Sequence, residues 1–139
     1  MFKESKALIA FREDILNRTF SDWLEAHISL MNPLHRYKGY LRIDRETLSF
    51  YGTEKKTGNE FSFQIYRSEI RQLYHGFDDA FTVWETRNLG LGWKPLRITF
   101  TREKKDFHLY LIINYTYGRT DNEIWMEVLN CHYCLRREP

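Results

Sequence analysis

Apolar and polar side chains alternate with a period of two through most of residues 36–116, and this pattern constrains the fold more than any other feature of the sequence. A period of two places successive side chains on opposite faces of a strand. The alternating runs cover residues 37–44, 48–51, 61–66, 81–84, 96–101 and 107–114, with a weaker run over 70–75. About seven short strands at regular spacing predict a small antiparallel β-barrel or sandwich.

The period changes to that of a helix after residue 119. Residues 120–123 read Thr-Asp-Asn-Glu, which is a capping box at the start of a helix. Apolar side chains then recur every three or four positions, as on one helical face. The expected face comprises Ile124, Val128, Cys131 or His132, and Leu135, with Trp125 and Leu129 beside it. The sequence therefore predicts one C-terminal helix that closes the barrel.

The first 35 residues are expected to form an extension on the domain of residues 36–139. Leu8, Phe11, Ile15, Trp23 and Leu24 fit a helical spacing with a break over residues 19–22, and residues 27–31 can form one more strand. Each such apolar side chain contributes roughly 1.5–3 kcal/mol when fully buried, so the segment must dock. We predict an ordered, partly helical extension that packs on the outward aromatic side chains of the barrel and buries Trp23.

Composition excludes several classes of protein. The 139 residues carry a net charge of +2, which is too small an excess for a nucleic-acid-binding domain. The longest apolar run, Leu109 to Ile113, is far shorter than the ~20 residues of a membrane span. The first residues lack the apolar core of a signal peptide, so a cytoplasmic protein is expected.

No catalytic, metal or cofactor site is expected. Cys131 and Cys134 sit near the end of the predicted helix, and the remaining histidines are scattered, whereas a structural zinc site needs about four ligands. Cys131 is therefore expected to be a small core residue. Asp78 and Asp79 are adjacent, and neighbouring carboxylates usually point apart. The glycine-containing segment 88–94 matches no nucleotide-binding loop, so the chain is predicted not to be an enzyme.

The alternating region resembles the pleckstrin-homology-like superfamily. Residues 38–44 (KGYLRID) and 48–52 (LSFYG) are similar to the opening hairpin of GRAM and bacterial pleckstrin-homology domains. Residues 68–70 are similar to their next strand junction, and Trp125 to the tryptophan of their closing helix. The resemblance covers roughly residues 36–136. It implies a non-enzymatic module that binds phosphoinositides, peptides or other proteins.

The resemblance also places basic side chains at one end of the barrel, where the first hairpin turn, the junction after the third strand and the last hairpin turn meet. This basic rim comprises Arg42, Arg45, Arg67, Arg102, Lys104 and Lys105. Lysine and arginine there can hold the phosphates of an anionic lipid headgroup. The alternative is a solvated rim, because the acidic residues Asp44, Glu46, Glu69, Glu103 and Asp106 lie among them.

Outward-facing aromatic residues are the more unusual feature, and they comprise Tyr40, Tyr51, Tyr66, Trp84 and Tyr110. Contiguous exposed aromatic side chains mark an interface. Either a partner or the first 35 residues cover them. The predicted function is a binding or scaffolding module for a protein partner or for itself. The alternative is a lipocalin-like carrier of an apolar ligand, which large core residues such as Phe50 and Phe100 disfavour because they fill a small barrel.

Overall fold

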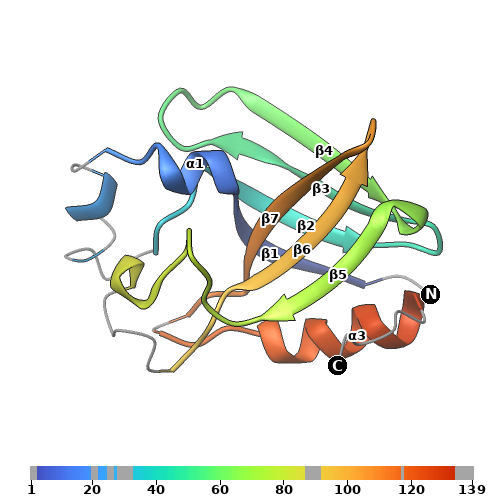
Figure 1. The fold of residues 1–139 in the computed structure, drawn as a ribbon. Coiled ribbons are helices and arrows are strands. Elements are labelled where there is room, and N and C mark those ends of the chain that lie inside the picture. The colour runs from blue at the N-terminus through green and yellow to red at the C-terminus, as the bar shows by residue number, and fades with distance from the viewer. Residues whose placement is uncertain are drawn as a thin grey trace.

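Seven antiparallel strands form one curled sheet in the order β4-β3-β2-β1-β7-β6-β5 (Figure 1). The computed structural model describes residues 3–19, 22–24, 27, 33–86, 92–116 and 118–133. The strands are β1 (Lys3–Phe11), β2 (Tyr37–Ile43), β3 (Thr47–Glu54), β4 (Glu60–Tyr66), β5 (Ile70–His75), β6 (Leu96–Arg102) and β7 (Lys105–Ile113). The helical segments are α1 (Arg12–Leu16), the short 3-10 turns η1 (Arg67–Glu69) and η2 (Val83–Glu85), and α3 (Asn122–Tyr133). The mainly β fold with a C-terminal helix is as expected, and the sheet is a half-barrel, which is consistent with the small β-barrel predicted.

The inner face of the curled sheet holds the main core. Alternate residues of each strand face inward, for example Leu41 on β2, Phe50 on β3 and Ile98 on β6, and all three are buried. Helix α3 lies along one opening of the half-barrel and inserts Trp125 into this core (Figure 1). The inner rows and the helix thus cover each other, which is how an amphipathic sheet buries its apolar face.

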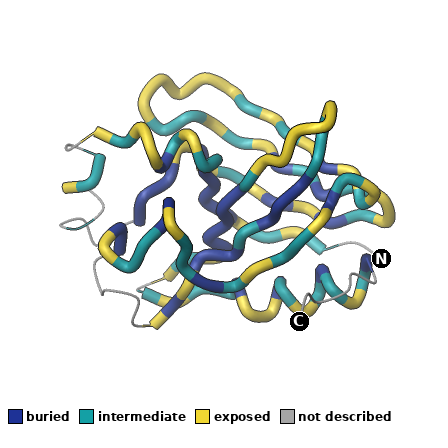
Figure 2. The backbone as a smooth tube through the Cα atoms, in the orientation of Figure 1, coloured by how far each residue is buried: buried dark blue, intermediate teal, exposed yellow. Residues whose placement is uncertain are grey.

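A second core lies on the opposite face of β1 and β7. It comprises Leu8, Ala10, Ile15, Leu34, Ala80, Phe81, Trp93, Tyr110 and Ile112. The central strands are therefore buried on both faces, and they form the darkest part of the tube in Figure 2. Burial on both faces explains why residues 109–113 of β7 are apolar without alternation.

The N-terminal residues differ from the prediction. Residues 3–11 form β1 and not a helix, and β1 pairs with β2 on one side and with β7 on the other. The boundary drawn at residue 36 therefore falls between two paired strands of one sheet. The expected helical part is confirmed for α1, residues 12–16, and for residues 22–24 and 27, which are also helical. Helical spacing misled because Leu8 and Ile9 face different cores, so both faces of β1 are apolar.

Residues 81–84 are not a strand. Phe81 is buried in the second core, and Val83–Glu85 form the 3-10 turn η2. The segment is held by Asp78, whose carboxylate accepts hydrogen bonds from the backbone N–H groups of Ala80 and Phe81. The number of strands is seven as predicted, but β1 takes the place of the strand expected at 81–84.

The buried stripe of α3 is rotated from the predicted one. Trp125, Leu129 and Tyr133 are buried, whereas Ile124 and Cys131 are exposed. Cys131 is therefore not the core residue that was expected. Two apolar stripes lie one residue apart in this sequence, and the one with the larger aromatic side chains faces the core because it buries more area.

Three expectations lie largely outside the described part of the chain: residues 28–31 of the possible strand over 27–31, residues 88–91 of the glycine-containing segment 88–94, and the helix end beyond 133. His27 is described, and it is helical and not part of a strand. Among the described residues, no helix has the length and apolar character needed to cross a membrane.

Candidate functional site

The outer face of β1–β4 presents two stacked tyrosines. Tyr40 on β2 and Tyr51 on β3 are direct cross-strand partners, and their ring centroids lie 5.6 Å apart. The two residues remain 41% and 45% exposed. Tyr66 at the end of β4 is also exposed. Large aromatic side chains held rigidly on an exposed sheet are typical of protein interfaces.

Hydrogen bonds fix this outer face. The Tyr51 hydroxyl donates to the Glu4 carboxylate at 2.7 Å, and this bond raises the pKa of Tyr51. Gln64 on β4 donates to the Ser49 hydroxyl at 3.4 Å. The tyrosine ring is therefore held in one orientation before any partner arrives, which lowers the entropic cost of binding.

Trp84, one of the five predicted interface aromatic residues, lies outside this face. Trp84 is in η2 and is the most exposed of the large apolar side chains, at 65%. Trp23, expected to be largely buried, is only half-buried, and its indole N–H donates to the Trp84 carbonyl at 3.2 Å. The N-terminal segment therefore leaves Tyr51 and Tyr66 exposed.

Tyr110 is a correction. It was expected on the surface, but it is 1% exposed and packs against Phe81 in the second core. Its hydroxyl donates to Asp78 at 2.6 Å, and burial followed by this bond raises the pKa of Tyr110 well above its usual value. The prediction that Tyr110 lies on the outer face of β7 is correct, but residues of the segment 77–86 cover that face.

The basic rim brings together the three connections that the sequence predicted. The backbone N–H of Arg67 in η1 donates to the Glu46 carbonyl in the β2–β3 turn. Arg102 at the end of β6 donates to Glu69 through two nitrogens and to the Gln64 carbonyl. Arg42 pairs with Asp44 at 3.2 Å. Arg45, Lys104 and Lys105 are exposed. Carboxylates thus already hold two of the six basic side chains of the rim.

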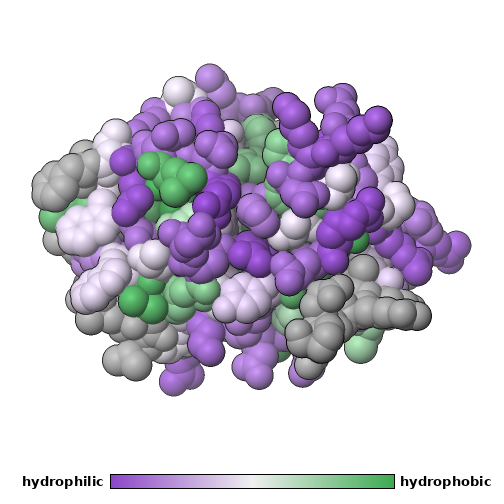
Figure 3. Space-filling view, viewed as in Figure 1, coloured by the Kyte–Doolittle hydropathy of each residue, from purple (hydrophilic) through white to green (hydrophobic). Residues whose placement is uncertain are grey.

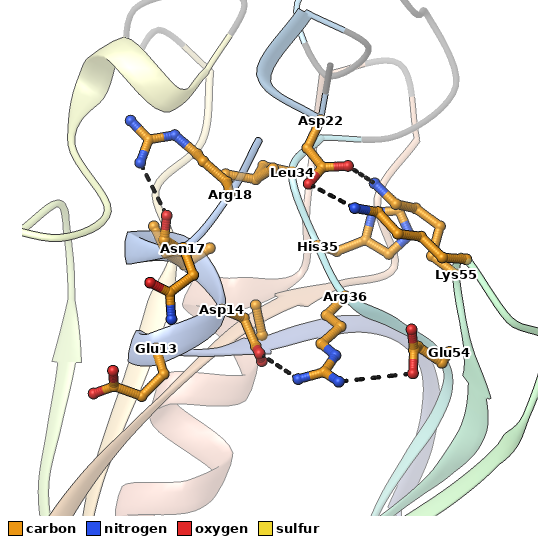
Figure 4. Close-up of a pocket in the computed structure, with 13 residues that line it drawn as sticks. Glu13, Asp14, Asn17, Arg18, Asp22, Leu34, His35, Arg36, Glu54 and Lys55 are labelled. Atoms are coloured by element: carbon orange, nitrogen blue, oxygen red, sulfur yellow. Dashed lines mark hydrogen bonds and ion pairs between the residues drawn. The ribbon is translucent and has the colours of Figure 1, made fainter. Parts of the chain in front are cut away.

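A charged pocket lies near the opposite end of the strands, between α1, the start of β2 and the end of β3 (Figure 4). Its volume is about 280 Å³. Arg36 lies between Asp14 at 2.7 Å and Glu54 at 3.7 Å. Burial alone would raise the pKa of Asp22, but hydrogen bonds from Thr19 and Lys56 outweigh it and lower that pKa.

The pocket is self-neutralised. Its lining contains four acidic residues, Glu13, Asp14, Asp22 and Glu54, and four basic ones, Arg18, Arg36, Lys55 and Lys56. Sequence reasoning did not single out this pocket, because its residues come from separate segments without a recognisable spacing. Its ion pairs connect α1 to β2 and β3, and we assign it a structural role.

Asp78 and Asp79 do not form a paired carboxylate site. Asp78 accepts from Arg97 and Tyr110, whereas Asp79 pairs with Arg12, so the adjacent carboxylates diverge as expected. The Arg12 guanidinium lowers the pKa of Asp79 to about 2. Within the described ranges, no three His, Cys, Asp or Glu side chains gather around a possible metal position.

A small apolar patch lies between β4 and the β6–β7 hairpin on the largely hydrophilic face drawn in Figure 3. At this seam the sheet ends without closing, because β4 and β5 are its two edge strands. Phe63 on β4 packs on Phe100 with ring centroids 5.6 Å apart, and Arg102 lies over both rings. The arginine thus covers part of the seam.

Comparison of the sequence with protein-family models and with curated proteins finds no match. Among solved structures, the chain is similar to the hSac2 domain of the human phosphoinositide phosphatase Sac2, with a TM-score of 0.51 and 10% sequence identity. The match covers 94% of this chain and 70% of that one. At this identity the similarity shows a shared fold alone.

Proposed function

We propose that this chain is a non-enzymatic binding module with a pleckstrin-homology-like fold, and that it docks a protein partner on the outer face of β1–β4. The observation that carries the proposal is the stacked, exposed Tyr40–Tyr51 pair in a hydrogen-bonded sheet face. Preorganised tyrosines supply large contact area at low entropic cost. A cytoplasmic location belongs to the same proposal.

The fold part of the proposal rests on topology and on the resemblance in sequence. Seven antiparallel strands precede a helix that carries a buried tryptophan, Trp125. The similarity to the hSac2 domain supports a shared architecture, and the word phosphatase describes the human protein. The Thr99 hydroxyl lies 2.9 Å from a ring nitrogen of His108, but Thr99 is buried between β6 and β7, and we propose no catalysis here.

An anionic headgroup on the basic rim receives less support than a protein partner. Arg102 is held by Glu69, whose pKa is lowered chiefly by that arginine, and Arg42 is held by Asp44. An incoming phosphate has to compete with these carboxylates and is repelled by the acidic residues beside them. Of the other four basic residues, Arg45, Lys104 and Lys105 are exposed to solvent, where the attraction of a phosphate is screened.

A carrier of apolar ligands also receives less support. The inner rows pack on each other, with Tyr37 stacked on Phe61 at a centroid distance of 3.8 Å and Trp125 buried in the same core. Side chains therefore occupy the space that a carrier keeps for its ligand.

Photo-crosslinking tests the docking face. A benzoylphenylalanine at Ser62, the cross-strand partner of Tyr51, should form a discrete adduct in cells of the source organism. The same group at Glu127, which is exposed on α3, should not. The Tyr40→Ser/Tyr51→Ser double variant should lose the adduct while its circular dichroism spectrum is unchanged. Equal adducts from both positions, or an adduct that survives the double variant, would show that the proposal is wrong.

A further inference from the structure

A groove on the outer face of the sheet adjoins the stacked tyrosines. It lies over β1, β2 and β7, has a volume of about 590 Å³, and is lined by Lys6, Ala7, Leu8, Lys38, Gly39, Tyr40, Thr53, Ile112 and Tyr115. Tyr40 belongs both to this groove and to the stacked pair. The groove therefore extends the proposed docking face toward the centre of the sheet.

The floor of the groove is apolar and fixed. Leu8 and Ile112 are cross-strand partners on β1 and β7, and both are buried. Both side chains also belong to the second core, so their positions are set by packing. An apolar side chain of a ligand can rest on this floor between Tyr40 and Tyr115.

The walls of the groove carry positive charge without a matching acid. Lys6 pairs with Tyr40 in the β1–β2 ladder and Lys38 pairs with Leu8, so the two lysines are diagonal neighbours on one face. Among the described residues, the lining contains no Asp or Glu, and neither lysine takes part in a salt bridge. The nearest carboxylate along β1, that of Glu4, is held by the Tyr51 hydroxyl.

This arrangement contrasts with the charged pocket near α1, whose acidic and basic residues are equal in number. Two lysines beside each other repel in the free protein, and an anionic group between them removes that repulsion. The complementary ligand therefore has a carboxylate next to an apolar side chain. An open groove that crosses β1, β2 and β7 fits an extended chain better than a compact molecule.

We propose that this groove binds an acidic segment of the protein partner, with an Asp or Glu between Lys6 and Lys38 and an apolar side chain on Leu8 and Ile112. The inference rests on the proposed docking function and specifies the chemistry of the partner. It also predicts that binding weakens as salt concentration rises, because the lysines are exposed to solvent.

A random twelve-residue peptide library displayed on phage is the probe. Selection on the wild-type protein should enrich sequences that place Asp or Glu next to Leu, Ile, Phe or Trp. Binding of a labelled selected peptide, measured by fluorescence anisotropy, should weaken about tenfold or more in the Lys6→Glu/Lys38→Glu variant, because like charges then face each other. The matched Lys104→Glu/Lys105→Glu variant makes the same change in net charge at the β6–β7 hairpin and should bind as the wild type does.

Three results would overturn the inference: no enriched peptide, enriched peptides without an acidic excess, or equal loss in both charge-reversed variants. The two proposals fail separately. A Ser62 adduct that persists in the Lys6→Glu/Lys38→Glu variant would support the docking face and contradict the proposal that an acidic segment binds in the groove. Peptide binding without any Ser62 adduct would support the groove proposal and contradict the proposed docking face.

Discussion

At the scale of single residues, Asn122 connects the helix to the sheet. It is fully buried, its side-chain oxygen accepts from the Ile113 N–H at 2.8 Å, and its side-chain nitrogen donates to the carbonyls of Lys94 and Leu111. Thr120 caps the same helix start by accepting from the Asn122 N–H at 3.3 Å. The capping residues predicted the start of α3, but nothing in their pattern predicted this burial.

Replacement of Asn122 by leucine should lower the free energy of unfolding by about 2–4 kcal/mol, because three buried backbone groups lose their partner. Urea denaturation followed by tryptophan fluorescence measures the change. Ile124→Ala on the exposed side of the same helix is the control and should cost well under 1 kcal/mol, apart from helix propensity. Equal losses in the two variants would contradict this role for Asn122.

Asp78 is a second residue on which the stability of the fold is expected to depend. Burial alone would raise its pKa, but hydrogen bonds from Tyr110, the Phe81 N–H, Arg97 and the Ala80 N–H outweigh burial and lower the pKa below 3.8. The folded protein therefore keeps this carboxylate charged at pH values where the unfolded chain binds a proton. The stabilisation is complete above about pH 4 and is lost as the pH falls through the folded pKa.

The Asp78→Asn variant should be less stable than the wild type at pH 7, and the difference in the free energy of unfolding should narrow as the pH falls below about 4. Urea midpoints at pH 7, 4 and 3 measure it. Comparison with the variant is needed because burial lowers the pKa of His75 and His108, which also reduces wild-type stability as the pH falls below about 6.5. A difference that stays constant with pH would rule out the Asp78 contribution.

At the scale of elements, two glycines allow β2 and β3 to approach closely. Gly39 and Gly52 are cross-strand partners, and a Cβ added to Gly39 would lie 2.1 Å from the Tyr51 carbonyl oxygen. No backbone shift confined to one residue relieves a contact of that length. Gly39→Ala should therefore unfold the protein or destabilise it by about 3 kcal/mol or more.

Gly58→Ala is the control for Gly39→Ala. Gly58 has a φ of +73° and nothing within 4 Å of an added Cβ, so only the backbone conformation opposes the substitution. Gly58→Ala should lower the free energy of unfolding by about 1–2 kcal/mol. Thermal unfolding of the three proteins compares the effects, and a Gly39→Ala protein as stable as Gly58→Ala would disprove the close approach.

The edge of β4 is protected by side chains of its neighbours. Arg102 donates to the Gln64 carbonyl, and Glu69 accepts from the Tyr66 N–H, so both ends of this stretch of the edge are occupied. Exposed strand edges pair with other chains unless they are covered. Arg102→Ala uncovers both the edge and the Phe63 ring.

The Arg102→Ala variant should therefore self-associate more strongly than the wild type as its concentration is raised. Light scattering coupled to size-exclusion chromatography measures the mass. Lys104→Ala removes a neighbouring positive charge without uncovering the edge and should behave as the wild type does. Self-association of both variants would show that the loss of a positive charge causes the effect, and not the uncovering of the β4 edge.

The sequence predicts elements well where one face is buried and poorly where both are. The alternation of residues 37–43 and 96–101 located β2 and β6, because polar residues mark their outer faces. In β1 the run Ala7 to Ala10 is buried throughout, so it offers no period to read. The stacked tyrosines were predictable from alternation, whereas the groove needed the pairing of β1 with β7.

At the scale of the whole molecule, β1 holds the two halves of the sheet together. It pairs with β2 from Lys3 to Ile9 and with β7 from Ala7 to Phe11. Without it, β2–β4 and β5–β7 share no ladder. A chain that lacks residues 3–11 should therefore be unfolded by circular dichroism, because neither three-stranded half covers its own apolar face.

A synthetic peptide of residues 1–12 should restore the fold of the truncated chain, because it carries the ladder and core contacts of β1. A scrambled peptide of the same composition is the control. Recovery of near-ultraviolet circular dichroism with the native peptide alone is the expected outcome. A truncated chain that folds unaided would show that the first strand is dispensable.

The place of β1 in the sheet also governs the order of events during synthesis. Phe11 pairs with Leu109, about 100 residues later, which the ribosome reaches about 5–20 s after it has made β1. During that interval β1 can pair only with β2, and the edge of β1 that later pairs with β7 has no partner strand. A nascent chain of this kind exposes a template for wrong pairing until its last strand emerges, so its yield in cells should depend on chaperones that bind extended apolar segments.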